Sequence, residues 1–308
     1  MAVKVFIQPV SWEATVSSDA RFERNLGFMS QVEQGQLENA TVSIAGVGGD
    51  GALLAVELAR MGVGSFKLAD PDPFEIENTN RQATCVTQTL GINKAVAVGD
   101  YLTSINPNIT IEIYKEGITA DNAAEFVKGS TLVIDETEFT LHALGIMVAR
   151  EARRHNIPVL TALNIGFGAI VTTYHPEGKP LERQLGFSEH DSIEDIAQQE
   201  VKIDRWLPYI PKYGDMNVLA KVASGEKSAP SIAPGVALAA AAASSQAFLN
   251  IVGRNNNRPK PVFAPKALII DVMSMEMKQI KFNRTSHYRH LARMLLANTL
   301  KNNPKADY

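Results

Sequence analysis

The first 180 residues alternate between short apolar runs rich in β-branched residues and longer segments whose apolar residues recur at helical spacing. The run "ATVSIAGVGGDG" stops at a group of glycines, and "ALLAVELARMGVG" then repeats apolar residues on one helix face until Gly62 and Gly64. This pattern predicts a strand, a tight turn and a helix.

The same alternation continues from Ser65 to Thr137. A strand "SFKLAD" ends at Asp70, and it is followed by a helix "NKAVAVGDYLTSINP", a strand "ITIEIYK", a helix "TADNAAEFVKG" that we expect Thr119 to cap, and a strand "TLVIDET". Strands that alternate with helices form parallel sheets covered on both faces. The predicted fold is therefore a doubly wound, mostly parallel α/β sheet.

The alternation breaks near Pro180, after a strand pair in "PVLTALNIG" and "GAIVTTYHPEG". Residues 180–232 are polar and interrupted by prolines, which predicts a partly helical crossover insertion. An alanine-rich run then predicts a buried helix, and "KALIIDV" with "MEMKQIKF" predicts closing strands. The predicted divisions are an N-terminal arm (1–40), an α/β core (41–179), the crossover insertion (180–232), a returning helix with closing strands (233–283) and a basic C-terminal tail (284–308).

Composition narrows the class of protein. The chain of 308 residues has a net charge of −3 with both signs interspersed, so nucleic-acid binding is disfavoured. The single cysteine, Cys85, excludes disulfide frameworks and cysteine-based zinc sites and fits a reducing compartment, so we expect a cytoplasmic protein without zinc. The apolar run "VALAAAAASSQAFLNIVG" is too weakly hydrophobic to span a bilayer, so no membrane association is expected.

The glycine-rich turn predicts a phosphate-binding loop. Gly46, Gly48, Gly49 and Gly51 follow a strand and open a helix, where backbone N–H groups and the helix dipole favour anions. Asp70 ends the next strand about twenty residues on, where a carboxylate would hold ribose hydroxyls. This spacing fits a dinucleotide as well as ATP, and glycines needed only for tight packing remain the alternative.

The polar stretch "DPDPFEIENTNRQ" behind that aspartate favours ATP. A dehydrogenase has no need of clustered amides and an arginine there. Transfer of AMP to a carboxylate develops charge on the phosphates, and an arginine, amide donors, a lysine and a magnesium ion stabilise such a charge. Side chains of these types are Asn78, Arg81, Gln82 and Lys94.

The ordered series "RFERN", "GVGGDG", "ADPDPFEIENTNRQ", "GINKA", "SINPNI" and "LVIDETE" resembles the ubiquitin-activating enzyme superfamily, most closely its ThiF/MoeB-like adenylyltransferases. The resemblance runs from about Arg21 to Phe282. It implies a Rossmann-like fold that binds ATP in the core at 41–179, with magnesium as a second cofactor and a homodimer as the assembly. The implied substrate is a carboxylate, such as that of a small carrier protein or a precursor peptide.

The resemblance also implies roles for single residues. Arg24 would be a finger donated from the N-terminal arm to the nucleotide of a neighbouring subunit, and Asp70 would bind the ribose. The implied catalytic residues are Arg24, Arg81, Lys94 and Asp135, and the implied nucleotide-binding residues are Gly46, Gly48, Gly49, Gly51, Asp70, Asp72, Asn78 and Gln82. The alternatives are a surface arginine at 24, a turn-forming Asn78 and a solvated Lys94.

The sequence departs from the family pattern at two places. Where the family has an aspartate that helps to hold magnesium, followed by an asparagine, this chain has Glu138 and Phe139, so Glu138 and Asp135 are the implied magnesium ligands. The alternative is that both only cap the next helix. The family's zinc-binding Cys-x-x-Cys pairs and its catalytic cysteine are missing, and Cys85 lies too early to replace the latter.

The crossover insertion and the tail carry weaker signals. Trp206, Tyr209 and Tyr213 lie among charged residues where family members cross the active-site mouth, so the insertion could cover the substrate or could have no chemical role. The histidines show no metal-binding spacing. The arginines of the tail are expected on a solvated helix face; they are Arg284, Arg289 and Arg293.

The expected function is ATP-dependent adenylation of a carboxylate, with release of pyrophosphate and transfer to a non-thiol nucleophile such as an amine or amide nitrogen. The acid could belong to a protein or peptide C-terminus, a small molecule or a modified nucleoside. The alternatives are a catalytically silent scaffold subunit, an adenylyltransferase for a sulfur-carrier protein without its own thiol, and a nicotinamide-dependent oxidoreductase.

Overall fold

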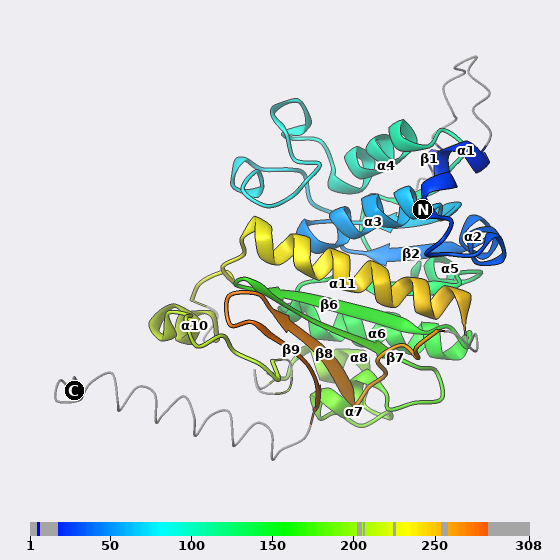
Figure 1. The fold of residues 1–308 in the computed structure, drawn as a ribbon. Helices are drawn as coiled ribbons and strands as arrows, with labels where there is room; N and C mark the ends of the chain where they lie inside the picture. Colours follow the sequence, from blue (N-terminus) through cyan, green and yellow to red (C-terminus); the bar gives the residue numbers. More distant parts are fainter. Residues whose placement is uncertain are drawn as a thin grey trace.

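A computed structural model describes residues 5–6, 18–201, 205, 207–223, 226–253 and 258–282. Its centre is one nine-stranded sheet with the order β1-β4-β3-β2-β5-β6-β7-β8-β9, and helices cover both faces of it (Figure 1). Trp206 and the predicted basic tail, with His287 and His290, lie outside the described residues.

Five neighbouring strands of this sheet are parallel. They are β4 (Thr110–Tyr114), β3 (Ser65–Ala69), β2 (Thr41–Ala45), β5 (Leu132–Asp135) and β6 (Val159–Ile165). From β2 the chain first builds outward to β3 and β4, then returns to the other side of β2 with β5 and β6. The predicted doubly wound α/β fold is confirmed. Such a reversal between β2 and β5 leaves a crevice at the carboxyl ends of the strands, where ligands bind in open α/β sheets.

The remaining strands are antiparallel and lie at the edges. β7 (Gly168–Tyr174), β8 (Lys266–Asp271) and β9 (Glu276–Lys281) continue the sheet beyond β6, and β1 (Val5–Phe6) pairs with β4 at the opposite edge. The predicted strand pair before the insertion and the predicted closing pair are both present.

One face of the sheet is covered by α3 (Gly49–Met61), α4 (Lys94–Ile105) and α11 (Ala233–Val252), which share one apolar core with β2, β3 and β4. The other face carries α5 (Ala123–Val127), α6 (His142–Arg154), α7 (Leu181–Leu185) and α8 (Ile193–Ala197). Successive strand residues point to opposite faces, so Ile44 belongs to the first core and Ala45 to the second. The helix α5 begins later than the sequence pattern suggests, and Asn122, not Thr119, is its N-cap residue.

The alanine-rich helix α11 is a core element. Among the described residues it is the one helix long and apolar enough to cross a membrane by length and composition, yet 72% of its most apolar window is buried in the protein. It lies along α3 and against β6 and β7. Small alanine side chains allow this close approach, which places the start of α11 beside the glycine-rich turn.

Shorter elements connect these layers. The N-terminal part contains α1 (Ser18–Phe22), η1 (Glu23–Asn25) and α2 (Gln31–Glu38), the last with a capping box between Ser30 and Glu33. The crossover contains α7, α8 and α10 (Met216–Ala223), as the prediction of a partly helical insertion requires. Three further 3₁₀ turns are η2 (Ile76–Asn78), η3 (Thr87–Thr89) and η4 (Phe139–Leu141).

Candidate functional site

The glycine-rich turn leaves β2 at the strand reversal, and two of its residues must be glycine. Gly46 has φ +87°, and a Cβ added there would lie 2.3 Å from the carbonyl oxygen of Glu136. A Cβ at Gly51 would lie 2.0 Å from the carbonyl oxygen of Gly46. The N–H of Gly46 donates to the carbonyl oxygen of Ala69 (2.8 Å), so the turn closes against the ends of both β3 and β5.

Gly48 and Gly49 carry no side chain that would separate the backbone N–H groups of the turn from a ligand. Gly48 is the N-cap of α3 and offers no side-chain acceptor to the first helical N–H groups. A Cβ at Gly48 would lie 3.6 Å from the side-chain nitrogen of Gln82, and one at Gly49 would lie 4.0 Å from Cγ of Arg81. Within the described part of the chain, the buried Oε1 of Gln82 has no hydrogen-bond partner. An amide oxygen accepts hydrogen bonds and does not bind an anion. The donors here are the uncapped N–H groups at the start of α3 and the nearby Nε2 of Gln82, and these fit a site for an anionic ligand.

Asp70 joins the glycine-rich turn to the segment after β3. Its Oδ2 accepts the N–H of Val47 (2.9 Å), and its Oδ1 accepts the N–H of Asp72 (3.0 Å). Burial raises the pKa of Asp70, while hydrogen bonding by Asp72 and the charge of Lys94 oppose that rise. The carboxylate therefore lies at the carboxyl end of β3, where the family resemblance implies a ribose ligand.

Lys94 begins α4 and is directed to the same region. Its ammonium pairs with Asp72 Oδ2 (3.0 Å), and its own N–H donates to the carbonyl oxygen of Asp72 (2.9 Å). The lysine is buried, whereas the side chain of its partner is 64% exposed. The structure thus does not place Lys94 on a solvated helix face.

Asn78 and Arg81 lie on the turn that faces the glycines. The buried Asn78 uses Oδ1 to accept the N–H of Glu75 (3.0 Å), so it shapes the turn. Arg81 Nη1 donates to the carbonyl oxygen of Glu77 (3.2 Å) and to Asn80 Oδ1 (2.8 Å). The same guanidinium has Nε and Nη2 without a hydrogen bond to any described residue, so these donors can serve an anion.

The two implied magnesium ligands do not converge. Asp135 Oδ1 accepts both the N–H (3.1 Å) and the hydroxyl (2.7 Å) of Thr137, and a Cβ at Gly145 would lie 2.5 Å from Asp135 Oδ2. Its carboxylate therefore faces α6, and burial raises its pKa. Glu138 is exposed, and its Oε2 accepts the hydroxyl of Thr140 (3.3 Å). Among the described residues no three His, Cys, Asp or Glu side chains form a group that could hold a metal ion.

Arg24 lies far from the glycine-rich turn of its own chain. It belongs to η1, whose Asn25 donates from Nδ2 to the carbonyl oxygen of Met61 (3.3 Å) at the last residue of α3. The glycine-rich turn is at the other end of this helix of 13 residues, about 20 Å away at 1.5 Å per residue. Within one chain the structure thus separates Arg24 from the other implied catalytic residues.

Sequence reasoning missed two carboxyl groups of this region, Asp50 and Glu136. Asp50, in the first turn of α3, accepts the backbone N–H (3.0 Å) and the side-chain amide (2.8 Å) of Asn164 at the end of β6. Glu136, directly after β5, accepts the N–H of Ala162 through Oε1 (2.8 Å). Burial raises the pKa of Asp50 to about 6; burial, with the nearby Asp50, raises the pKa of Glu136 well above its usual value. The available signal was that Asp50 lies within the glycine-rich turn and that Glu136 directly follows β5, at the carboxyl ends of the strands.

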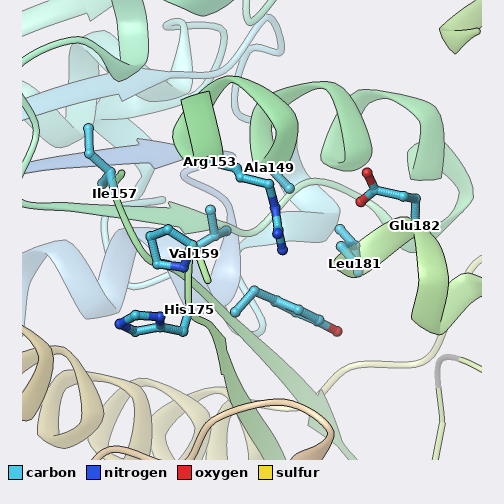
Figure 2. Close-up of a pocket in the computed structure, with 9 residues that line it drawn as sticks. Ala149, Arg153, Ile157, Val159, His175, Leu181 and Glu182 are labelled. Atoms are coloured by element: carbon cyan, nitrogen blue, oxygen red, sulfur yellow. The ribbon is translucent and has the colours of Figure 1, made fainter. Parts of the chain in front are cut away.

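Cys85 lies beside this region, where its N–H donates to the carbonyl oxygen of Gln82 (2.9 Å), whereas the small hollow of Figure 2 lies apart from it. The thiol of Cys85 is buried and donates to the carbonyl oxygen of Glu75 (3.5 Å), and burial raises its pKa. The hollow, with Arg153, His175 and Leu181 among its lining residues, lies between α6 and the strand ends opposite the glycine-rich turn (Figure 2). It has room for about one water molecule.

Comparison with known proteins finds a matching family and several relatives. A model of the ThiF family matches residues 22–290. The tRNA threonylcarbamoyladenosine dehydratase of Escherichia coli K12 is 31% identical over 129 residues, which cover 42% of this chain and 47% of that protein. The adenylyltransferase and sulfurtransferase MOCS3 of Anopheles gambiae is 33% identical over 173 residues, 54% of this chain and 38% of that protein. The chain thus spans less than half the length of both relatives.

Two solved structures share the arrangement of elements. PaaA superposes with a TM-score of 0.63 at 22% identity, over 90% of this chain and 78% of PaaA. MccB of E. coli in complex with MccA-N7isoASN also superposes with a TM-score of 0.63 at 22% identity, over 88% of this chain and 73% of MccB. At this level of identity, the likeness supports the fold alone.

Proposed function

Because the chain belongs to the ThiF family, we propose that it activates a carboxylate by transfer of AMP from ATP. A carboxylate oxygen attacks the α-phosphorus, and the bond from that phosphorus to the leaving pyrophosphate breaks. The observation that carries the proposal is the facing pair of turns at the strand reversal, with the glycines on one side and Arg81 and the side-chain Nε2 of Gln82 on the other. This arrangement suits a polyphosphate better than any neutral ligand.

In this proposal each group acts on a different part of ATP. The N–H groups at the start of α3 bind phosphate oxygens, and Asp70 binds the ribose hydroxyls. Arg81 and Lys94 offset the charge that develops on the phosphates as pyrophosphate leaves, and the amide of Gln82 donates to a phosphate oxygen. In the structure Asp70 is already fixed by Val47 and Asp72, which favours a preformed site.

Magnesium would enter this site mainly through the nucleotide. The described carboxylates offer no cage of three ligands, whereas Mg²⁺ commonly keeps several waters and takes one or two carboxylates together with phosphate oxygens. Glu138 is exposed and Asp135 is engaged by Thr137, so Glu138 is the more accessible of the two proposed ligands. When bound, the ion would neutralise phosphate charge.

The activated acyl group is proposed to pass to a nitrogen nucleophile. Cys85 is buried and bonded to a backbone carbonyl, so it is a poor acceptor of an acyl group. Candidate acids are the C-terminus of a carrier protein or precursor peptide, or the acid of a modified tRNA nucleoside, the last in view of the dehydratase relative. The proposed setting is a homodimer in the cytoplasm.

Calorimetric titration with Mg·ATP and with NAD tests the nucleotide assignment. We expect Mg·ATP to bind and NAD to bind far more weakly, because a nicotinamide dinucleotide does not use the arginine, lysine and amide behind Asp70. Tighter binding of NAD would contradict the proposal. Pyrophosphate exchange in the presence of peptides encoded by neighbouring reading frames then tests adenylation itself.

Arg81→Ala and Lys94→Ala test the placement of the phosphates. Each variant is expected to keep the fold and to lose adenylation by ~10²-fold or more, the usual order for one electrostatic contact to a transition state. Asn39→Ala is the control, because this exposed amide bonds the carbonyl oxygen of Gly35 at the end of α2, before β2 begins, whereas the glycine-rich turn follows the other end of β2. Full activity of either variant would show that the phosphates lie elsewhere.

A further inference from the structure

Arg81 is held by its neighbour in sequence. Asn80 Oδ1 accepts from Arg81 Nη1 at 2.8 Å, while the methylene stem of Arg81 lies against Gly49. An exposed arginine side chain has several rotatable bonds, and each ordered rotamer costs conformational entropy. A fixed acceptor on the next residue therefore limits where the guanidinium points before any ligand arrives.

Asn80 itself is tied to a distant part of the chain. Its Nδ2 donates to the carbonyl oxygen of Ser231 at 3.1 Å, across 151 residues of sequence. Ser231 lies at the end of the crossover insertion, two residues before α11 begins at Ala233. The amide of Asn80 thus uses its oxygen for Arg81 and its nitrogen for the crossover.

The chain of hydrogen bonds continues from the crossover into the glycine-rich turn. The hydroxyl of Ser231 donates to Asn164 Oδ1 (2.8 Å), and Asn164 Nδ2 donates to both carboxylate oxygens of Asp50 (3.0 and 2.8 Å). Asp50 lies between Gly49 and Gly51 of the turn. Four segments that are far apart in sequence are therefore joined around one side of the nucleotide site.

We infer that Asn80 is a positioning residue that fixes Arg81 for the phosphates by anchoring it to the end of the crossover at Ser231. The inference rests on the proposed function and adds a residue that the family resemblance did not single out as a ligand. Asn80 acts on the nucleotide through Arg81 alone, and does not itself bind it. The position of the crossover at Ser231 and the position of the Arg81 guanidinium are therefore linked through Asn80.

A double-mutant cycle with Mg·ATP as the titrated ligand tests this inference. Asn80→Ala in the otherwise unchanged chain is expected to weaken Mg·ATP binding by about threefold to tenfold, the range for one lost hydrogen bond. When Arg81 is already replaced by alanine, Asn80→Ala is expected to cause no further loss of Mg·ATP affinity, because Asn80 influences the nucleotide only through the guanidinium of Arg81. Asn39→Ala serves as the matched exposed-asparagine control, and thermal melts check that all variants fold.

The outcomes separate a positioning role from a structural one. Conservative replacement by Asn80→Gln, which keeps one acceptor and one donor, is expected to restore part of the affinity. Unchanged binding by Asn80→Ala, or a loss that persists in full without Arg81, would overturn the inference while leaving ATP binding intact. If the unmodified chain fails to bind Mg·ATP, the proposed function is contradicted and the inference falls with it.

Discussion

At the scale of single residues, Asp50 and Glu136 bring two carboxyl groups together beside the glycine-rich turn. Each is fixed by donors from β6, Asp50 by Asn164 and Glu136 by Ala162. Burial raises the pKa of both groups, and the charge of Asp50 raises that of Glu136 further. Carboxyl groups with a raised pKa at a ligand site often serve the chemistry there, so we expect this edge of the site to respond to pH.

Glu136→Gln is expected to stabilise the folded protein at neutral pH. The folded-state pKa of Glu136 is raised, so its ionisation costs stability above about pH 4.5 and the cost grows until pH exceeds the raised value. The glutamine keeps an oxygen for the N–H of Ala162. A gain of about 1 kcal/mol would raise Tm by about 1–2 °C at pH 7.5 for a chain of 308 residues.

Thermal melts at pH 7.5 and pH 4.5 check this expectation. The gain should shrink at pH 4.5, where Glu136 carries its proton in the folded state. Glu138→Gln, at an exposed position two residues on, is expected to leave Tm unchanged. A lower Tm for Glu136→Gln at pH 7.5 would show that the ionised carboxylate stabilises the fold.

Cys85 is expected to be dispensable for the chemistry. Its thiol is buried and bonded to the carbonyl oxygen of Glu75, so Cys85→Ser should keep Mg·ATP binding and pyrophosphate exchange with a modest loss of stability. Cys85→Ala separates the loss of packing from the loss of a nucleophile. A substrate thioester trapped on the unmodified chain, with both variants inactive in product formation, would identify Cys85 as the acceptor.

At the scale of elements, the crossover insertion is attached to the sheet through a buried aspartate. Asp271, the last residue of β8, is fully buried, and its Oδ2 accepts the hydroxyls of Tyr209 (2.9 Å) and Tyr213 (3.1 Å). The hydroxyl of Tyr213 also accepts the N–H of Phe167 in the turn between β6 and β7 (2.8 Å). These contacts hold the segment before α10 near the carboxyl end of β6, on the side of the nucleotide site.

Tyr209→Phe is expected to loosen this attachment. The buried Asp271 loses one of its two tyrosine donors, which typically costs about 1–3 kcal/mol when a buried acceptor is left short of partners. Limited proteolysis should then cut residues 207–223 faster than in the unmodified chain. Tyr101→Phe, at a more exposed position on α4, is the control, and equal cleavage rates for all three proteins would show that the aspartate does not anchor the crossover.

At the scale of the whole molecule, Arg24 lies at the opposite end of α3 from the glycine-rich turn. An arginine placed there can act on a nucleotide only if it belongs to a neighbouring subunit. A closed two-fold pair would supply each site with one such residue and leave two equivalent sites. The expected assembly is therefore a homodimer, and sedimentation that shows only monomer at micromolar concentration would contradict it.

Mixing Arg24→Ala with Lys94→Ala chains tests the shared site. Each homodimer lacks one group at both sites, whereas a mixed dimer has one complete site. With free exchange, about a quarter of the sites should regain tight Mg·ATP binding, because half of the dimers are mixed. Binding that stays at the level of the separate variants would mean that Arg24 does not act across an interface.

The sequence by itself determined the parallel core and the position of the glycine-rich turn. Hydrophobic periodicity and glycines at fixed spacing are local properties, and they sufficed for β2, α3 and Asp70 because strand, turn and helix are consecutive there. The tertiary structure alone decided that Asp50 meets Asn164, that Asn80 meets Ser231, and that Arg24 lies away from the loop. Asp50 and Asn164 are 114 residues apart in sequence, and Asn80 and Ser231 are 151 apart. Their contacts depend on where the crossover returns to the sheet, and the hydrophobic pattern along the chain does not specify that position.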